Sequence, residues 1–135
     1  MVSSAIEDYL SAIYRFQVTK KEVKSRDLVS YLALSKSAVS EMLARLRKMG
    51  LITHERYSNV VLTKKGEKVA EKIVFKHRVI ELFLTKMLDR KKEDVHAEAH
   101  KLEHAFTDQS IKKIYELLGE PIQGAHGEPI PYVKI

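Results

Sequence analysis

The sequence predicts a mainly α-helical protein that begins with a winged helix-turn-helix. Helix breakers are scarce, with 5 glycines and 3 prolines in 135 residues, so long helices should dominate. Three amphipathic segments precede two short β-type runs, which is the element order of a winged helix-turn-helix. Longer helical patterns then fill the second half. The length fits one compact domain or two small ones that share a core.

The first three helices are expected before residue 50. Residues 7–16 place apolar side chains at three- and four-residue spacing, as on one face of a helix. Ser25 can cap a second short helix, with Asp27 in its first turn. A third helix follows Ser35 and ends at Gly50, a residue type that commonly follows a helix. The tight connection between the second and third helices predicts a helix-turn-helix.

A two-stranded wing is expected next. Residues 51–57 and 60–63 are short β-type runs, and Ser58-Asn59 between them is a turn candidate. These runs complete the winged helix-turn-helix.

The second half of the chain is expected to be helical. Thr63 can cap a long helix through about Leu88, and a second helix covers residues 93–106. Thr107 can cap a last helix that reaches Leu118. Residues 123–135 contain glycine and proline and are expected to be extended or irregular.

Charge divides the chain in the same way. Residues 1–70 carry 13 Lys and Arg against 7 Asp and Glu, whereas residues 71–135 carry 11 of each, so the whole excess of +6 lies in the first half. Five of the six histidines lie in the second half. A basic region suggests a polyanion partner, and a region rich in His and Glu suggests metal or proton chemistry. The alternative is that the positive surface serves only solubility. Two domains are therefore expected, 1–70 and 71–135.

Several classes of protein are disfavoured. The absence of cysteine excludes disulfides, a thiolate nucleophile and a cysteine zinc site. No apolar run approaches the roughly 20 residues that span a bilayer, and the first residues do not resemble a signal sequence, so we expect a cytoplasmic protein without a membrane partner. We find no zinc-protease motif, nucleophile elbow, P-loop or glycine-rich dinucleotide turn, and expect neither enzymatic activity nor a small organic substrate.

A metal site is indicated by side chains at helical spacing. At about 100° per residue, four potential ligands of the helix over 93–106 share a sector of about 100°. These ligands are His96, His100, Glu103 and His104. His77 and Glu81 repeat the relation at i, i+4 on the preceding helix. Imidazole and carboxylate without sulfur suit Fe(II), Mn(II), Co(II), Ni(II) or Zn(II). The alternative is that these are ordinary solvated helix residues.

DNA contacts are expected around the third helix. Residues near its N-terminal end could reach base edges: Ser35, Lys36, Ser37, Ser40 and Glu41. Basic residues could contact phosphates: Arg26, Arg45, Arg47, Lys48, Arg56, Lys64 and Lys65. Each single charge could equally be a solvated surface residue.

The chain resembles the DtxR/MntR (diphtheria-toxin-repressor-like) family of metal-dependent transcriptional regulators. The resemblance covers nearly the whole chain and rests on six segments: Glu7-Asp8-Tyr9-Leu10, Ser37-Ala38-Val39-Ser40, Leu62-Thr63-Lys64-Lys65-Gly66, Lys76-His77-Arg78, the ligand helix at 95–104 and Gly127-Glu128-Pro129-Ile130-Pro131. It implies an operator-binding winged helix followed by a helical dimerisation and metal-binding region. The ligand helix is the most specific of these segments.

The resemblance also implies two sets of metal ligands. One set is Asp8, His100, Glu103 and His104. The other, an ancillary site, is His77, Glu81 and His96.

The chain departs from the family pattern at four places. His100 stands where one branch has Cys and the manganese branch has Glu, and Ser11 stands where the manganese branch has a Glu ligand. Glu41 replaces a Gln that relatives use in the recognition helix. We expect no SH3-like third domain after Ile135, so the further ancillary ligands that such a domain supplies are expected to be missing.

The resemblance implies a repressor that binds double-stranded operator DNA as a homodimer when divalent Fe or Mn is bound, and that controls metal homeostasis genes. Zn(II), Co(II) and Ni(II) are expected to bind in vitro. Two alternatives stay open. One is a metal-independent winged-helix regulator whose histidines are incidental. The other is a small di-metal oxidase, although only Glu93 and His96 supply the Glu-x-x-His pair that such a centre needs from two helices.

Overall fold

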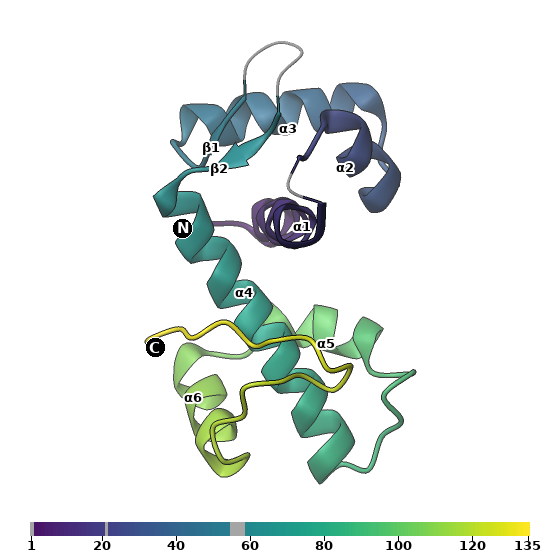
Figure 1. The fold of residues 1–135 in the computed structure, drawn as a ribbon, viewed down its shortest axis with the longest axis vertical. Coiled ribbons are helices and arrows are strands. Elements are labelled where there is room, and N and C mark those ends of the chain that lie inside the picture. The colour runs from purple at the N-terminus through teal and green to yellow at the C-terminus, as the bar shows by residue number, and fades with distance from the viewer. Residues whose placement is uncertain (1, 21, 55–58) are drawn as a thin grey trace. The chain divides into compact units, whose positions relative to one another are not determined.

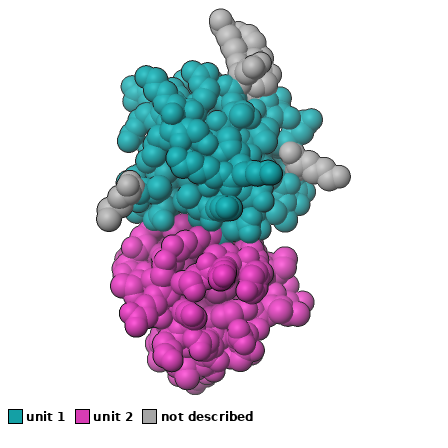
Figure 2. All heavy atoms as spheres, turned by 90° about the vertical axis from the view of Figure 1, so that its left-hand side faces the viewer, with its two compact units in different colours: residues 1–71 teal, residues 72–135 magenta. Residues whose placement is uncertain are grey.

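A computed structural model describes residues 2–20, 22–54 and 59–135 (Figure 1). The elements follow in the order α1 (Ser4–Lys20), α2 (Ser25–Leu32), α3 (Lys36–Lys48), β1 (Ile52–Thr53), β2 (Val61–Leu62), α4 (Lys64–Leu82), the π-helix η1 (Phe83–Met87), α5 (His96–Glu103) and α6 (Asp108–Leu117). They form two compact units, residues 1–71 and 72–135 (Figure 2). The predicted fold class, mainly α with an N-terminal winged helix-turn-helix, is confirmed. Among the described residues, no helix combines the length and apolar character needed to cross a membrane.

The core of the first unit forms around α1. This helix buries Leu10 and Ile13 completely, and they belong to the same apolar cluster as Leu28 of α2 and Leu46 of α3. Figure 1 shows α2, α3 and the two strands gathered on one side of α1. Burying each such side chain is worth about 1.5–3 kcal/mol, so the cluster fixes α3 on its scaffold.

The caps of the helix-turn-helix differ in part from expectation. Ser25 is the first residue of α2 and the N-cap is Lys24, so the prediction that Ser25 caps the helix is wrong. The backbone N–H of Lys24 donates instead to Oδ2 of Asp27 at 2.8 Å, because that carboxylate reaches back over the first turn. Ser35 does cap α3, its Oγ accepting from the N–H of Ala38 at 3.1 Å.

The wing is shorter than predicted in its described part. β1 and β2 are antiparallel, with Ile52 opposite Leu62 and Thr53 opposite Val61. Residues 55–57 of the predicted first run and Ser58 of the predicted turn lie outside the described residues.

The outer edge of β2 is also bonded. Val60 donates its N–H to the carbonyl of Val23 at 2.7 Å, and Leu62 donates its N–H to Oε1 of Gln17 at 2.9 Å. Gln17 of α1 therefore holds the wing strand from the side opposite β1.

The long helix of the second half changes type before it ends. The sequence predicts one helix to about Leu88, whereas regular α4 stops at Leu82 and continues as the π-helical turn η1. Thr63 caps α4, its Oγ1 accepting from the N–H of Gly66 at 3.1 Å. After Leu88, Asp89 has a positive φ of 54°, which turns the chain away.

The ligand helix α5 is shorter than predicted. It covers His96–Glu103 instead of residues 93–106, with Val95 as the N-cap and His104 as the C-cap. Residues 92–94 form a turn in which Asp94 donates its N–H to the carbonyl of Lys91. Val95 and Ala99 are fully buried in the cluster that Phe75 and Val79 of α4 supply. Packing therefore fixes which face of α5 turns toward α4.

The end of the chain lies against α4. Thr107 caps α6 as predicted, its Oγ1 accepting from the N–H of Ser110. Beyond α6, Gln123 and Pro129 form an isolated antiparallel bridge. Arg78 of α4 donates to the carbonyl of Pro129, which fastens this turn to the helix.

Candidate functional site

A group of buried, ionisable side chains in the second unit consists of His77, Glu81 and Glu103. His77 and Glu81 on α4 are 3% and 2% exposed, and Glu103 at the end of α5 is 1% exposed. Buried carboxylates are rare unless they are paired or bind a metal. The contacts of these three residues therefore decide what the region can do.

His77 and Glu103 form a close pair. Nδ1 of His77 donates to Oε1 of Glu103 over 2.6 Å. This bond leaves Nε2 of His77 as the atom that faces the rest of the cluster, which is the usual arrangement of a metal-binding histidine held by a carboxylate. Burial pulls the pKa of His77 down, but its bond to Glu103 and the nearby carboxylate of Glu81 outweigh burial, and the pKa is raised.

The first candidate metal group consists of His77, Glu81 and His96, and His77 contributes the atom Nε2. It lies 3.4 Å from Oε2 of Glu81 and 3.2 Å from Nδ1 of His96. The same carboxylate oxygen lies 3.6 Å from Nδ1 of His96. Burial raises the pKa of Glu81, but the neighbouring imidazoles outweigh it and the pKa is lowered.

An oxygen of Glu81 supports a cation at this place. Its Oε2 is buried and makes no hydrogen bond among the described residues. A buried carboxylate oxygen left without a hydrogen bond is costly, and a divalent ion between it and two imidazole nitrogens removes that cost. The donor set therefore fits a first-row divalent metal.

A second group forms at the C-terminal end of α5. His100, Glu103 and His104 each offer one ligand atom, and these atoms lie within 4.8 Å of one another. The imidazole rings of His100 and His104 are 5.5 Å apart at 77°, and Oε2 of Glu103 lies 3.5 Å from Nε2 of His104. The structure thus brings together three of the four residues expected in this site. Asp8 is half-buried on α1 in the first unit, and its role as a ligand stays a prediction.

Two neighbouring residues were missed in the sequence. His126 and Glu128 lie in the turn after α6, and with Glu81 they offer ligand atoms within 4.8 Å of one another. Nε2 of His126 donates to the carbonyl of Lys92 at 2.8 Å, so Nδ1 is the atom that faces Oε1 of Glu81, at 3.6 Å. Only the clustering of histidines in the second half signalled His126. Nothing local predicts that the tail folds back onto α4.

The predicted DNA-facing residues lie on the exposed side of the first unit. Arg26 stands in the first turn of α2. Those at the start of α3 or along it are exposed: Ser35, Lys36, Ser37, Ser40, Glu41, Arg45, Arg47 and Lys48. Lys64 and Lys65 are exposed at the start of α4. Arg56 lies outside the described residues. Their contacts with DNA stay predictions.

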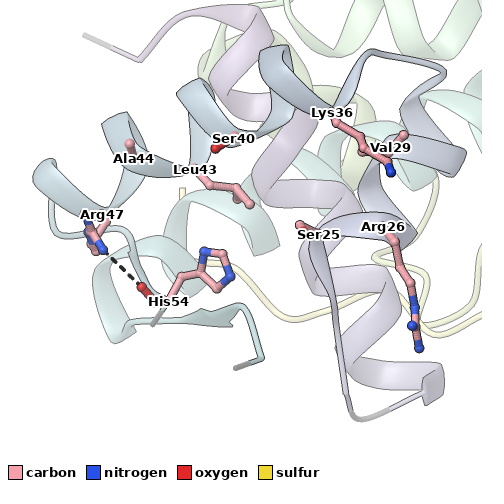
Figure 3. A pocket seen from close by; sticks show the side chains of 9 residues that line it. All are labelled: Ser25, Arg26, Val29, Lys36, Ser40, Leu43, Ala44, Arg47 and His54. Atoms are coloured by element: carbon pink, nitrogen blue, oxygen red, sulfur yellow. Dashed lines mark hydrogen bonds between the residues drawn. The ribbon is translucent and has the colours of Figure 1, made fainter. Parts of the chain in front are cut away.

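A hollow of about 590 Å³ opens beside α3. Figure 3 shows its lining: Ser25, Arg26, Val29, Lys36, Ser40, Leu43, Ala44, Arg47 and His54. Nη1 of Arg47 donates to the backbone carbonyl of His54 at 3.2 Å, which joins α3 to the residue after β1. Sequence reasoning did not include Ser25 and His54 among the functional residues, because their approach to α3 depends on the tertiary fold.

Two family models match the chain. Residues 1–60 match the N-terminal DNA-binding domain of the iron-dependent repressors, and residues 63–132 match their metal-binding and dimerisation domain. Together these matches cover nearly the whole sequence.

Individual relatives agree with the family models. An uncharacterised HTH-type transcriptional regulator from Methanocaldococcus jannaschii is 36% identical over 84% of this chain and 91% of its own. The HTH-type transcriptional regulator MntR from Bacillus subtilis is 30% identical over 87% of this chain and 82% of its own.

A solved structure also matches closely. A manganese-dependent transcriptional repressor in complex with manganese is 35% identical and superposes with a TM-score of 0.88 over 94% of this chain. The present chain spans 58% of the length of that protein. From the family models, the identities and the shared fold we conclude that the chain belongs to the DtxR/MntR family of iron- and manganese-dependent transcriptional regulators.

Proposed function

We propose that this protein is a transcriptional repressor that binds operator DNA as a homodimer when a divalent metal is bound. The observation that carries the proposal is the cluster of imidazoles and carboxylates in the second unit, where Oε2 of the buried Glu81 faces the imidazoles of His77 and His96 without a hydrogen bond. The first unit supplies a winged helix-turn-helix with exposed basic side chains on α3. Residues 1–70 would bind DNA, and residues 71–135 would hold the metal and the dimer interface.

The metal ligands are proposed in two sets. His77, Glu81 and His96 form one set within the second unit, and His126 lies at its border. His100, Glu103 and His104 form the other, with Asp8 as the ligand from α1. A bound divalent ion supplies the positive charge that carboxylates from separate elements can share.

Asp8 gives the metal a route to the DNA-binding unit. His100, Glu103 and His104 lie on or next to a single helix, so they cannot couple the two units alone. Asp8 lies on α1, whose buried face supports α3. A carboxylate from α1 in the metal site would therefore stabilise the arrangement of the winged helix-turn-helix that binds the operator.

Iron(II) or manganese(II) is the proposed physiological metal. The related regulators are described as iron- or manganese-dependent. A site of nitrogen and oxygen donors without sulfur suits either ion. From the general order of divalent affinities, Zn(II), Co(II) and Ni(II) should also bind this site in vitro. The target genes would be those of metal homeostasis. As a DNA-binding regulator, the protein would act in the cytoplasm.

The matched relatives are transcriptional regulators, and we propose no enzymatic activity for this chain. A di-metal oxidase would consume O2 when loaded with Fe(II). Oxygen uptake no faster than that of free Fe(II) is the result expected here.

The proposal is tested by measuring DNA affinity against metal. Purified protein is titrated onto duplex DNA from its own promoter region by fluorescence anisotropy, with Mn(II), Fe(II), Zn(II) or a chelator. Metal should tighten binding by at least tenfold over chelator, since coupling energies of 1–3 kcal/mol are typical. Equal affinity with metal and with chelator would favour a metal-independent regulator and overturn the metal-dependent one.

A further inference from the structure

The hollow beside α3 has the charge of an anion site. Arg26, Lys36 and Arg47 line it from two helices, and Ser25 and Ser40 add hydroxyl groups. Val29 and Leu43 make part of the wall apolar. None of the described residues that line the hollow is acidic. The lining therefore suits a group that is negatively charged and accepts several hydrogen bonds.

The position of the hollow identifies the anion. It lies between the first turn of α2 and one face of α3, next to the end of β1 (Figure 3). In a winged helix-turn-helix these elements flank the groove that the recognition helix enters, where a DNA strand runs. A phosphodiester is thus the anion that reaches this hollow when α3 lies in the major groove.

His54 adds a titratable group to this site. Figure 3 shows its imidazole pointing into the space between Arg47 and Ser25. The bond from Arg47 to the backbone carbonyl of His54 holds the backbone from which the imidazole extends. An imidazole at this position can donate to a phosphate oxygen, and it does so more strongly when it is protonated.

The charges around His54 are all positive among the described residues nearby. The charges of Arg47 on α3 and of Lys24, the residue before α2, act on the imidazole, and Lys36 and Arg26 line the same hollow. On its own strand, the residues that follow lie outside the described part of the chain. Burial, together with the charges of Arg47 and Lys24, lowers the pKa of His54, so the free protein carries it neutral near pH 7.

We propose that this hollow holds a phosphodiester of the DNA backbone and that His54 takes up a proton from solvent when the phosphate enters. The proposal rests on the proposed DNA-binding function. A phosphate neutralises the neighbouring cations and accepts from the ring, so the protonated imidazole is more stable in the complex than in the free protein. DNA binding consequently tightens as the pH falls through the interval between the free and bound pKa values.

The test compares the pH dependence of DNA binding in the wild type and in His54→Gln. Affinity for one duplex is measured by anisotropy from pH 6 to pH 8, at constant ionic strength and with saturating Mn(II). Any titration at the metal-binding histidines is common to both proteins, so it cancels in the ratio of their DNA affinities at each pH. The wild type should gain up to about tenfold more affinity than His54→Gln on going from pH 8 to pH 6, as one unit of pKa difference allows.

Two further variants make the readout specific. His54→Lys carries its charge at every pH in this range, so it should bind at pH 8 more tightly than the wild type and lack the additional pH dependence. Arg26→Gln should weaken binding by a similar factor at every pH, because it removes a fixed charge. Circular dichroism checks that each variant is folded.

Calorimetry in two buffers of different ionisation enthalpy counts the protons directly. The wild type should take up more protons on binding than His54→Gln does. Equal pH profiles and equal proton uptake in the two proteins would overturn the proposal for His54. Failure of every protein, wild type included, to bind duplex DNA would instead overturn the proposed function and this proposal with it.

Discussion

Nδ1 of His77 lies 2.6 Å from Oε1 of Glu103, and this contact joins the two groups of ligands that the sequence separates into two sites. The other oxygen of the same carboxylate lies 3.5 Å from His104. Glu103 therefore orients a ligand of one group while belonging to the other. We expect metal binding at either group to affect the other through this carboxylate.

The first prediction concerns the protonation of His77. Glu103→Gln removes the charge that raises the pKa of His77, so in metal-free protein that pKa should fall. Because the folded pKa is raised in the wild type, the pair stabilises the fold at low pH, and the contribution is lost as the pH rises through that pKa. NMR titration of the histidine ring resonances measures the change. Glu98→Gln, at the carboxylate that pairs with Arg90, is the control. An unchanged pKa of His77 in Glu103→Gln would contradict the claim that Glu103 raises it.

The second prediction concerns coupling between metal and DNA. Asp8→Ala should leave the metal-free DNA affinity unchanged and remove most of the gain that Mn(II) produces, because the variant lacks the ligand proposed from α1. Anisotropy titrations with Mn(II) and with chelator measure both quantities. Glu7→Ala alters the neighbouring acid on the same helix and should keep the metal response. If Asp8→Ala is activated as fully as the wild type, the proposed coupling is wrong.

The third prediction concerns the junction of the wing and α4. A Cβ on Gly66 would lie 2.0 Å from the backbone carbonyl oxygen of Leu51, which is not a flexible side chain that can move aside. Gly66→Ala should therefore lower the free energy of unfolding by about 3 kcal/mol, at the upper end for overpacking. Urea unfolding measures the loss. Glu67→Ala, at the exposed next position, should change stability by no more than about 0.5 kcal/mol.

The fourth prediction is a pH dependence at the start of α2. The hydrogen bond from Lys20, together with that from the backbone N–H of Lys24, lowers the pKa of Asp27. The folded pKa lies below the unfolded one, so Asp27 stabilises the fold above the unfolded pKa and the contribution is lost as the pH falls through the folded pKa.

Asp27→Asn should accordingly cost about 1 kcal/mol at pH 7, as for the loss of a helix cap. The difference from the wild type should shrink as the pH falls below about 4. Urea unfolding at pH 7 and pH 3 tests this, with Glu22→Gln as the control. A difference that is the same at both pH values would contradict the role given to the ionised carboxylate.

The fifth prediction concerns assembly. Leu88 and Leu117 in the second unit are 53% and 70% exposed, so each leaves apolar surface available for a partner subunit. The double variant Leu88→Glu, Leu117→Glu should shift the proposed homodimer toward monomer in sedimentation at micromolar concentration. Val18→Glu, at a 62% exposed position of the first unit, should leave the dimer intact. A wild type that sediments as a monomer with and without metal would refute the dimer itself.

Local sequence signals predicted what local contacts determine. Ser35 and Thr107 cap their helices as expected, because a cap needs only a side chain and a backbone N–H three residues later. The same rule failed at Ser25, where Asp27 reaches back to Lys24. Ser25 and Asp27 could both accept a hydrogen bond from a backbone N–H at the start of α2, and the geometry of the turn decides which of them does.

Long-range contacts were the part that could not be predicted. Helical spacing put His77 beside Glu81, but the bond between His77 and Glu103 joins residues 26 positions apart on two helices. His126 reaches Glu81 only because the chain folds back after α6. Residue spacing says which side chains share a helix face, and only packing says which faces meet.

The bonded outer edge of β2 has a consequence for solubility. The N–H groups of Val60 and Leu62 are taken by Val23 and Gln17, so the donors that point away from β1 cannot pair with a strand from another molecule. An unprotected edge in so small a sheet would invite edge-to-edge aggregation wherever many copies collect on the same stretch of DNA. Because Gln17 of α1 and Val23 before α2 occupy these donors, two copies of the molecule cannot pair their wings along this edge.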